Sequence, residues 1–272
     1  MEQNHVNALA IGRGKVQLWP MQDGAGYIQN GGDAGDDAVT LWIAAHSDVA
    51  TDAARLAPIL ARLGVLELSN ADKWAAWPIA VTGWSVPMRL VGGEGVREAL
   101  GAMGEGHDAP HIIGLSLNPI ELAVRPRAVQ AIAHVASLIG TAVDATAIYW
   151  PPAKLWSDAA ELPHAVAAME GSGMPPILHF VRFSVPNPGE MATEGLGWLA
   201  GHELAATMPA DMTVAEGVRR LARFAIDLML NGPMAGDMVI AGLERGERIH
   251  IQLPHAAGEP IRLVITTGDG RQ

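Results

Sequence analysis

Two apolar segments, Val39-Thr-Leu-Trp-Ile-Ala-Ala45 and His111-Ile-Ile-Gly-Leu-Ser-Leu117, decide the fold class that the sequence predicts. Both are too short for a stable helix and rich in large or branched apolar residues, which is typical of buried strands. Between them the spacing of apolar residues predicts two helices, near 51–63 and 94–103, and two more strands, 65–68 and 79–90. The resulting order is β-α-β-β-α-β, the pattern of ferredoxin-like folds.

The same order of elements follows a helix predicted over 126–139, with Pro126 in its first turn. Two further helices are predicted over 162–169 and after Thr213, which is a suitable capping residue. The strands predicted in this part are 145–150, 176–185, 195–208, 238–243, 249–253 and 261–266. We therefore expect an α+β protein of two similar ferredoxin-like halves, with mostly antiparallel sheet and a C-terminal β-hairpin.

The first 38 residues differ from the rest of the chain. Five glycines and four aspartates lie between residues 23 and 37, with few apolar side chains among them. So little burial cannot offset the entropy lost on ordering. We expect a flexible N-terminal arm over 1–38, a first α+β half over 39–124 and a second over 125–272.

Composition excludes several classes of protein. The chain has 272 residues, of which 49% are hydrophobic and 17% charged, so it is not intrinsically disordered. Its net charge of −11 argues against nucleic acid or an anionic membrane as a partner, because both attract a basic surface. The absence of cysteine excludes disulfides and thiol chemistry.

No apolar run is long enough to cross a membrane, and the first residues lack a basic start followed by an apolar core. The sequence therefore predicts a cytoplasmic protein. We also expect no cofactor and no structural metal, since no two histidines and a carboxylate share an obvious face.

Polar and aromatic side chains gather in two places that are candidates for a ligand-binding site. Glu194 and Glu203 lie on either side of a Gly-rich stretch, and they are a candidate acid–base pair if a bulge turns both carboxylates to one face. The alternative is a polar strand end in solvent. Aromatic residues after 148 are suited to stacking on a planar or sugar ligand, or else to core packing. The candidates are Tyr149, Trp150, Trp156, Glu194, His202 and Glu203.

Within this set, Glu203 is our first candidate for a functional residue. It follows a stretch of glycines, which allow a ligand or another backbone to approach closely. The alternative is structural: Glu203 is a cap or pairs with an arginine of the helix that follows. The arginines in question are Arg219, Arg220 and Arg223.

No complete catalytic or metal-binding motif is present, so we expect a non-catalytic binding or protein-interaction module. Its partner would be a protein or a small molecule, and a homo-oligomer stays open. The alternatives are a hydrolase-like enzyme with a site around Tyr149, Trp150, Glu194, His202 and Glu203, and an acidic, inhibitor-like protein that covers a basic enzyme face.

Several short motifs, taken in order, resemble a known bacterial family. They are Ala109-Pro-His-Ile-Ile-Gly-Leu115, Ala147-Ile-Tyr-Trp150 with Pro151-Pro-Ala behind it, Thr193-Glu-Gly-Leu196, His202-Glu203-Leu204 and the helix after Thr213. Over about two thirds of the chain the sequence resembles the bacterial "domain of unknown function 4261" family. Pro151 stands where similar proteins often have glycine. The resemblance implies an α+β fold and no particular activity.

Overall fold

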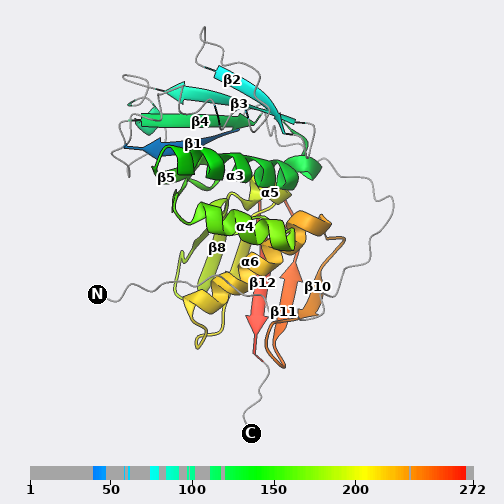
Figure 1. Cartoon of the computed structure of the whole chain (residues 1–272). Helices are drawn as coiled ribbons and strands as arrows, with labels where there is room; N and C mark the ends of the chain where they lie inside the picture. Colours follow the sequence, from blue (N-terminus) through cyan, green and yellow to red (C-terminus); the bar gives the residue numbers. More distant parts are fainter. Residues whose placement is uncertain are drawn as a thin grey trace, which may run out of the picture.

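The computed structural model describes residues 39–46, 58, 61, 74–79, 84–91, 97, 99–101, 111–117, 120–232 and 234–267. The predicted N-terminal arm, residues 1–38, and the predicted strand at 65–68 lie outside these residues. The described part of the chain forms two six-stranded sheets with helices between them (Figure 1).

Sheet 1 is antiparallel throughout, with the order β2-β3-β4-β1-β5-β6. Its central strands are the two segments that suggested the fold class, and they pair along their whole length, from Val39 opposite Leu117 to Ala45 opposite His111. The six strands are β1 (Val39–Ala45), β2 (Trp74–Ile79), β3 (Trp84–Val91), β4 (His111–Leu117), β5 (Ala145–Trp150) and β6 (Leu155–Asp158).

Sheet 2 has the order β10-β11-β12-β9-β8-β7, and only β12 and β9 run parallel. The strands are β7 (Arg182–Ser184), β8 (Glu190–Glu194), β9 (Leu204–Thr207), β10 (Met238–Ala241), β11 (Arg248–Gln252) and β12 (Ile261–Thr266). The α+β class with mostly antiparallel sheet is thereby confirmed.

The strand order differs from that of two ferredoxin-like halves. In a ferredoxin-like half, β1 would lie between two strands of its own half. Here β1 lies between β4 and β5, and β5 belongs to the predicted second half. The boundary that we predicted between residues 124 and 125 therefore does not separate the sheets, since β5 and β6 complete sheet 1. Strand order depends on pairing between distant segments, which a local pattern does not contain.

Two predicted strands are also corrected by the structure. The segment 176–185 begins with a 3-10 helix, η4 (Ile177–His179), and only its end is the strand β7. The segment 195–208 is divided into a short helix, α5 (Leu196–Ala200), and the strand β9. Helical turns of three to five residues are too short to show a 3.6-residue period in a sequence.

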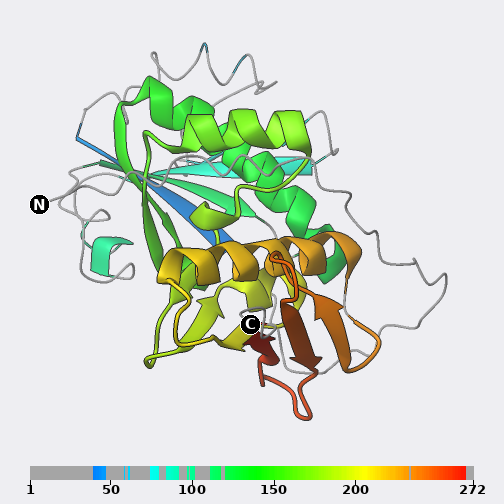
Figure 2. The same cartoon turned by 90° about the horizontal axis from the view of Figure 1, so that it is seen from below.

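The helices form the layer between the two sheets (Figures 1 and 2). Helix α3 (Arg125–Ala142) packs on β1, β4 and β5, while α6 (Val214–Asn231) packs on β8 and β9. Contacts of α3 with α4 (Leu162–Ser172), and of α5 with both α3 and α6, connect the two packed units. One hydrophobic core includes side chains from both sheets and from these helices.

Local capping explains where the two long helices begin. Pro126 lies in the first turn of α3, as predicted, where its missing N–H costs nothing. At the start of α6, Thr213 and Glu216 form a reciprocal capping box, in which each side chain binds the other residue's backbone N–H. Within the described residues, we find no helix that is long and apolar enough to cross a membrane.

Candidate functional site

The two aromatic candidates of β5 point in opposite directions, because successive side chains of a strand alternate between its faces. Trp150 faces the helices and is completely buried. Its ring makes edge contacts with Phe180 and Trp198, at 5.0 and 5.2 Å between ring centroids. Trp150 is thus part of the hydrophobic core, which is the alternative that the sequence left open.

Tyr149 lies on the other face of sheet 1 and is 6% exposed. It stands opposite Trp156 of β6, and the two rings are 4.9 Å apart. Burial raises the pKa of the Tyr149 phenol, while the positive charges of Lys154 and Arg182 act to lower it. Tyr149 and Trp156 therefore lie together, and Trp150 lies apart from both.

The carboxylate of Glu203 is held by four hydrogen bonds from the segment 193–197. Oε1 accepts from the backbone N–H groups of Gly195 at 2.8 Å and Gly197 at 2.9 Å. Oε2 accepts from the Thr193 hydroxyl at 2.7 Å and from the N–H of Leu196 at 3.2 Å. These N–H groups lie at the start of α5 and have no partner within so short a helix. Glu203 therefore caps α5.

The opposite end of α5 is bound by a positive charge. The Arg125 Nη1 atom donates to the carbonyl oxygen of Trp198 at 2.8 Å, and its guanidinium lies 5.0 Å from the centre of the Trp198 ring. A carboxylate at the N-terminus and a guanidinium near the C-terminus both match the helix dipole. The two side chains together stabilise a helix of five residues that would not form alone.

Thr193 connects this capped helix to the next strand. Its hydroxyl donates to Glu203 and accepts a hydrogen bond from the N–H of Leu204 at 2.7 Å. The backbone carbonyl of Glu203 in turn accepts from the N–H of Ile261 in β12. Glu203 therefore has a structural role as a cap, and it pairs with none of Arg219, Arg220 and Arg223.

Gly195 is required at the start of α5 by both its backbone angle and its surroundings. Its φ is +95°, and a Cβ atom added there would lie 2.7 Å from the Cβ of Ala153. We expect Gly195→Ala to lower the free energy of unfolding by about 2 kcal/mol, from left-handed strain and from this overlap.

Gly173 offers a matched control for this substitution, since its φ is +73° with no atom within 4 Å of an added Cβ. We expect Gly173→Ala to cost about 1 kcal/mol, from the backbone alone. Urea unfolding of both variants tests the difference. Equal losses would show that the contact with Ala153 has no energetic weight.

The second carboxylate candidate, Glu194, is engaged elsewhere. It forms ion pairs with Lys154, at 3.0 Å, and with Arg182 of the neighbouring strand β7. His202 is half-buried and, within the described residues, has no hydrogen bond or ion pair. Glu194 and Glu203 therefore bind different groups, and they do not form an acid–base pair.

Two polar contacts, one buried and one half-buried, were not predicted from the sequence. Arg220 of α6 and Glu247 form a bidentate ion pair, with 2.8 Å from Nε to Oε1 and 2.6 Å from Nη2 to Oε2. The Nδ1 atom of His179 lies 3.1 Å from the Ser157 hydroxyl, and burial lowers the pKa of this histidine. At the first contact, a Cβ at Gly242 would overlap the Glu247 carboxylate, a constraint that only the structure reveals.

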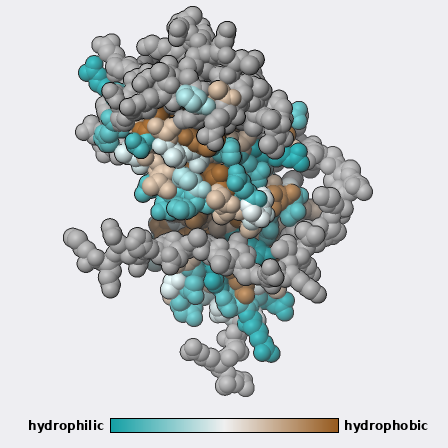
Figure 3. Space-filling model, viewed as in Figure 1, coloured by the Kyte–Doolittle hydropathy of each residue, from teal (hydrophilic) through white to brown (hydrophobic). Residues whose placement is uncertain are grey.

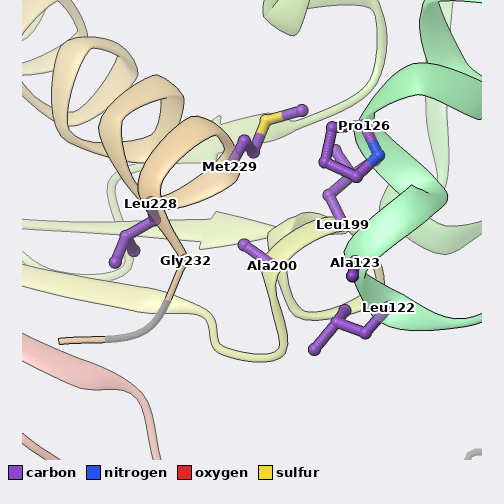
Figure 4. A pocket seen from close by; sticks show the side chains of 8 residues that line it. All are labelled: Leu122, Ala123, Pro126, Leu199, Ala200, Leu228, Met229 and Gly232. Atoms are coloured by element: carbon purple, nitrogen blue, oxygen red, sulfur yellow. The ribbon is translucent and has the colours of Figure 1, made fainter. Parts of the chain in front are cut away.

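A small apolar pocket of about 40 Å³ lies where η2 (Leu122–Val124) and the start of α3 approach the ends of α5 and α6 (Figure 4). Leu122, Leu199 and Met229 are among its lining residues, and none of the predicted site residues lines it. A cavity of this volume holds one or two water-sized groups, so it is too small for a substrate.

Comparison of the chain with family models, with curated proteins and with solved structures found no match. The resemblance to the domain of unknown function 4261 family therefore stays a prediction.

Proposed function

We propose that the protein is a non-catalytic interaction module that binds another protein through the face of sheet 2 on which no described helix packs. The observation that carries this proposal is a set of exposed basic side chains on that face that have no ion-pair partner among the described residues. The cytoplasmic location predicted from the sequence is compatible with the proposal and is part of it.

The two faces of sheet 2 differ sharply. Ile249, Ile251 and Leu263 point toward the helices and are buried, whereas Arg248, His250 and Arg262 alternate with them and are exposed. Within the described residues, the helices that contact sheet 2 pack on its buried face. An antiparallel sheet can leave one face to water or to a partner.

The exposed face is basic at one end of the sheet in a chain with a net charge of −11. Neither Arg248 nor Arg262 has an ion-pair partner within the part of the chain that the structure describes. Glu190 and Glu194 of this face are on β8, beyond β9 and β12, and Asp237, exposed directly before β10, accepts a hydrogen bond from the Leu253 N–H. Such a local excess of one charge favours a partner of the opposite charge.

Six large apolar side chains are exposed among the described residues: Leu178, Val185, Val214, Leu230, Val239 and Leu243. Of these, Val239 lies on the same face of sheet 2 as His250. On the side shown in Figure 3, hydrophobic residues form small areas separated by hydrophilic ones. Charge on the sheet face is therefore the stronger indication of a binding surface.

The alternative prediction is a hydrolase, and it requires the candidate side chains to contact one substrate together. These side chains are Tyr149, Trp150, Glu194, His202 and Glu203. Against it, Glu203 caps α5, Glu194 is ion-paired, and Trp150 is in the core. These contacts support a role in folding for the residues that first suggested catalysis.

Site-specific photo-crosslinking tests the interaction in the cells that make the protein. A photoreactive amino acid at Gln252 or Thr266, both exposed on the face, is expected to give a discrete adduct with another protein. The same amino acid at Arg127, exposed on α3, is the control. Adducts of equal yield from all three positions, or none from the face, would contradict the proposal.

A further inference from the structure

The strand at one end of sheet 2, β10, has an edge that no described strand covers. The sheet order begins at β10, so one side of its backbone has no pairing partner within the described residues. Proteins usually protect such an edge with charged residues, proline or a bulge. The four residues of β10, Met238-Val-Ile-Ala241, contain none of these, and Val239 is 53% exposed.

The charged residues of the strands at this edge are arginines, while Asp237, directly before β10, is exposed and accepts a hydrogen bond from the Leu253 N–H at 2.8 Å. β10, β11 and β12 together contain no acidic residue, but they include Arg248, His250 and Arg262. Cross-strand pairing places His250 opposite Val239 and Arg248 opposite Ala241. The side chains of Val239 and Ala241 are short, so the longer side chains of β11 can reach over them to the open edge.

The charges distinguish between two occupants of the edge. A second copy paired through its own β10 would bring two basic faces together, and like charges at an interface oppose association. An acidic segment of another protein would instead meet complementary charge. An extended segment would also pair its backbone with β10, the usual way in which peptides recognise a sheet edge.

We propose that β10 receives an extended, acidic segment of a partner protein as an added strand, with carboxylates on the face that carries Arg248, His250 and Arg262. This inference rests on the proposed function and names the partner's chemistry and its mode of binding. Backbone pairing would supply part of the affinity, and the basic side chains would select acidic over basic segments.

A short synthetic peptide of alternating Glu and Val is the probe, used with the full chain and followed by fluorescence anisotropy. We expect this peptide to bind and to slow amide hydrogen exchange in β10. Its affinity should fall as salt is added. A Lys–Val peptide of the same length is expected not to bind. Arg248→Glu and Arg262→Glu should each weaken binding about fivefold, while Arg127→Glu, with the same charge change, should not.

An N-methylated version of the acidic peptide, which cannot pair as a strand, separates the two parts of the inference. It is expected to lose binding; equal binding by this peptide would overturn strand addition. No binding of the unmodified acidic peptide would overturn the whole inference, and crosslinking at Gln252 or Thr266 would still stand as the test of the proposed function. A dimer whose β10 amides are protected without peptide would assign the edge to a second copy and also overturn the inference.

Discussion

Arg220→Met is expected to lower the free energy of unfolding by about 3–5 kcal/mol, because it leaves the carboxylate of Glu247 buried without its counter-charge. Arg220 is 4% and Glu247 2% exposed. The guanidinium satisfies both carboxylate oxygens and also donates from Nη1 to the backbone carbonyl of Glu216. The pair joins α6 to the turn between β10 and β11.

The double variant Arg220→Met with Glu247→Leu provides the matched comparison. Replacing both members of a buried ion pair by apolar residues is often neutral or stabilising, so we expect most of the lost stability to return. Denaturant unfolding of the wild type, both single variants and the double variant measures the coupling. A double variant as unstable as the sum of the singles would contradict this account.

The effect of Arg220→Met is also expected to depend on pH. Burial acts to raise the pKa of Glu247, but the hydrogen bonds and charge of Arg220, with the N–H groups of Leu243 and Glu244, outweigh it and lower the pKa. Because the pKa of Glu247 is lower in the folded than in the unfolded state, its ionised carboxylate stabilises the fold at pH values above the unfolded-state pKa. This stability is lost as the pH falls through the lower, folded-state pKa. The difference between wild type and Arg220→Met should therefore be larger at neutral than at acidic pH.

Glu203→Ala is expected to lower the free energy of unfolding by about 3 kcal/mol, since it removes four hydrogen bonds to a charged acceptor at the start of α5. For a chain of this size, each kcal/mol corresponds to about 2–4 °C in Tm. Glu203→Gln should show a smaller loss, because an amide oxygen still accepts from some of these donors.

The same variants distinguish a structural from a functional Glu203. If Glu203 only caps α5, Glu203→Gln lowers Tm and leaves crosslinking through Gln252 unchanged. His202→Gln is the control. The His202 side chain is next to Glu203 in the sequence and has no hydrogen bond or ion pair within the described residues, so this variant should keep the wild-type Tm. Wild-type Tm in Glu203→Gln, together with lost binding, would reverse our assignment.

The local elements were predictable because their signals lie within a few residues of one another. The apolar run at 39–45, the proline at the start of α3 and the Thr213 cap of α6 each reflect contacts inside a single strand or helical turn. Composition likewise favoured a folded chain, and the predicted order of elements favoured the α+β class. The segment 195–208 was predicted as a strand because its helical part, five residues between two left-handed glycines, is too short to show a period.

The roles of the polar side chains were decided only by the tertiary structure. Nothing in the local sequence indicates that Glu203 would bind backbone N–H groups six to eight residues before it, or that Arg220 would pair with Glu247 across 27 residues. The basic face likewise appears only when β10, β11 and β12 are placed side by side at the end of a sheet. Secondary structure follows from short-range sterics and hydrogen bonding, whereas the partner of a buried charge and the order of strands depend on which distant segments the core brings together.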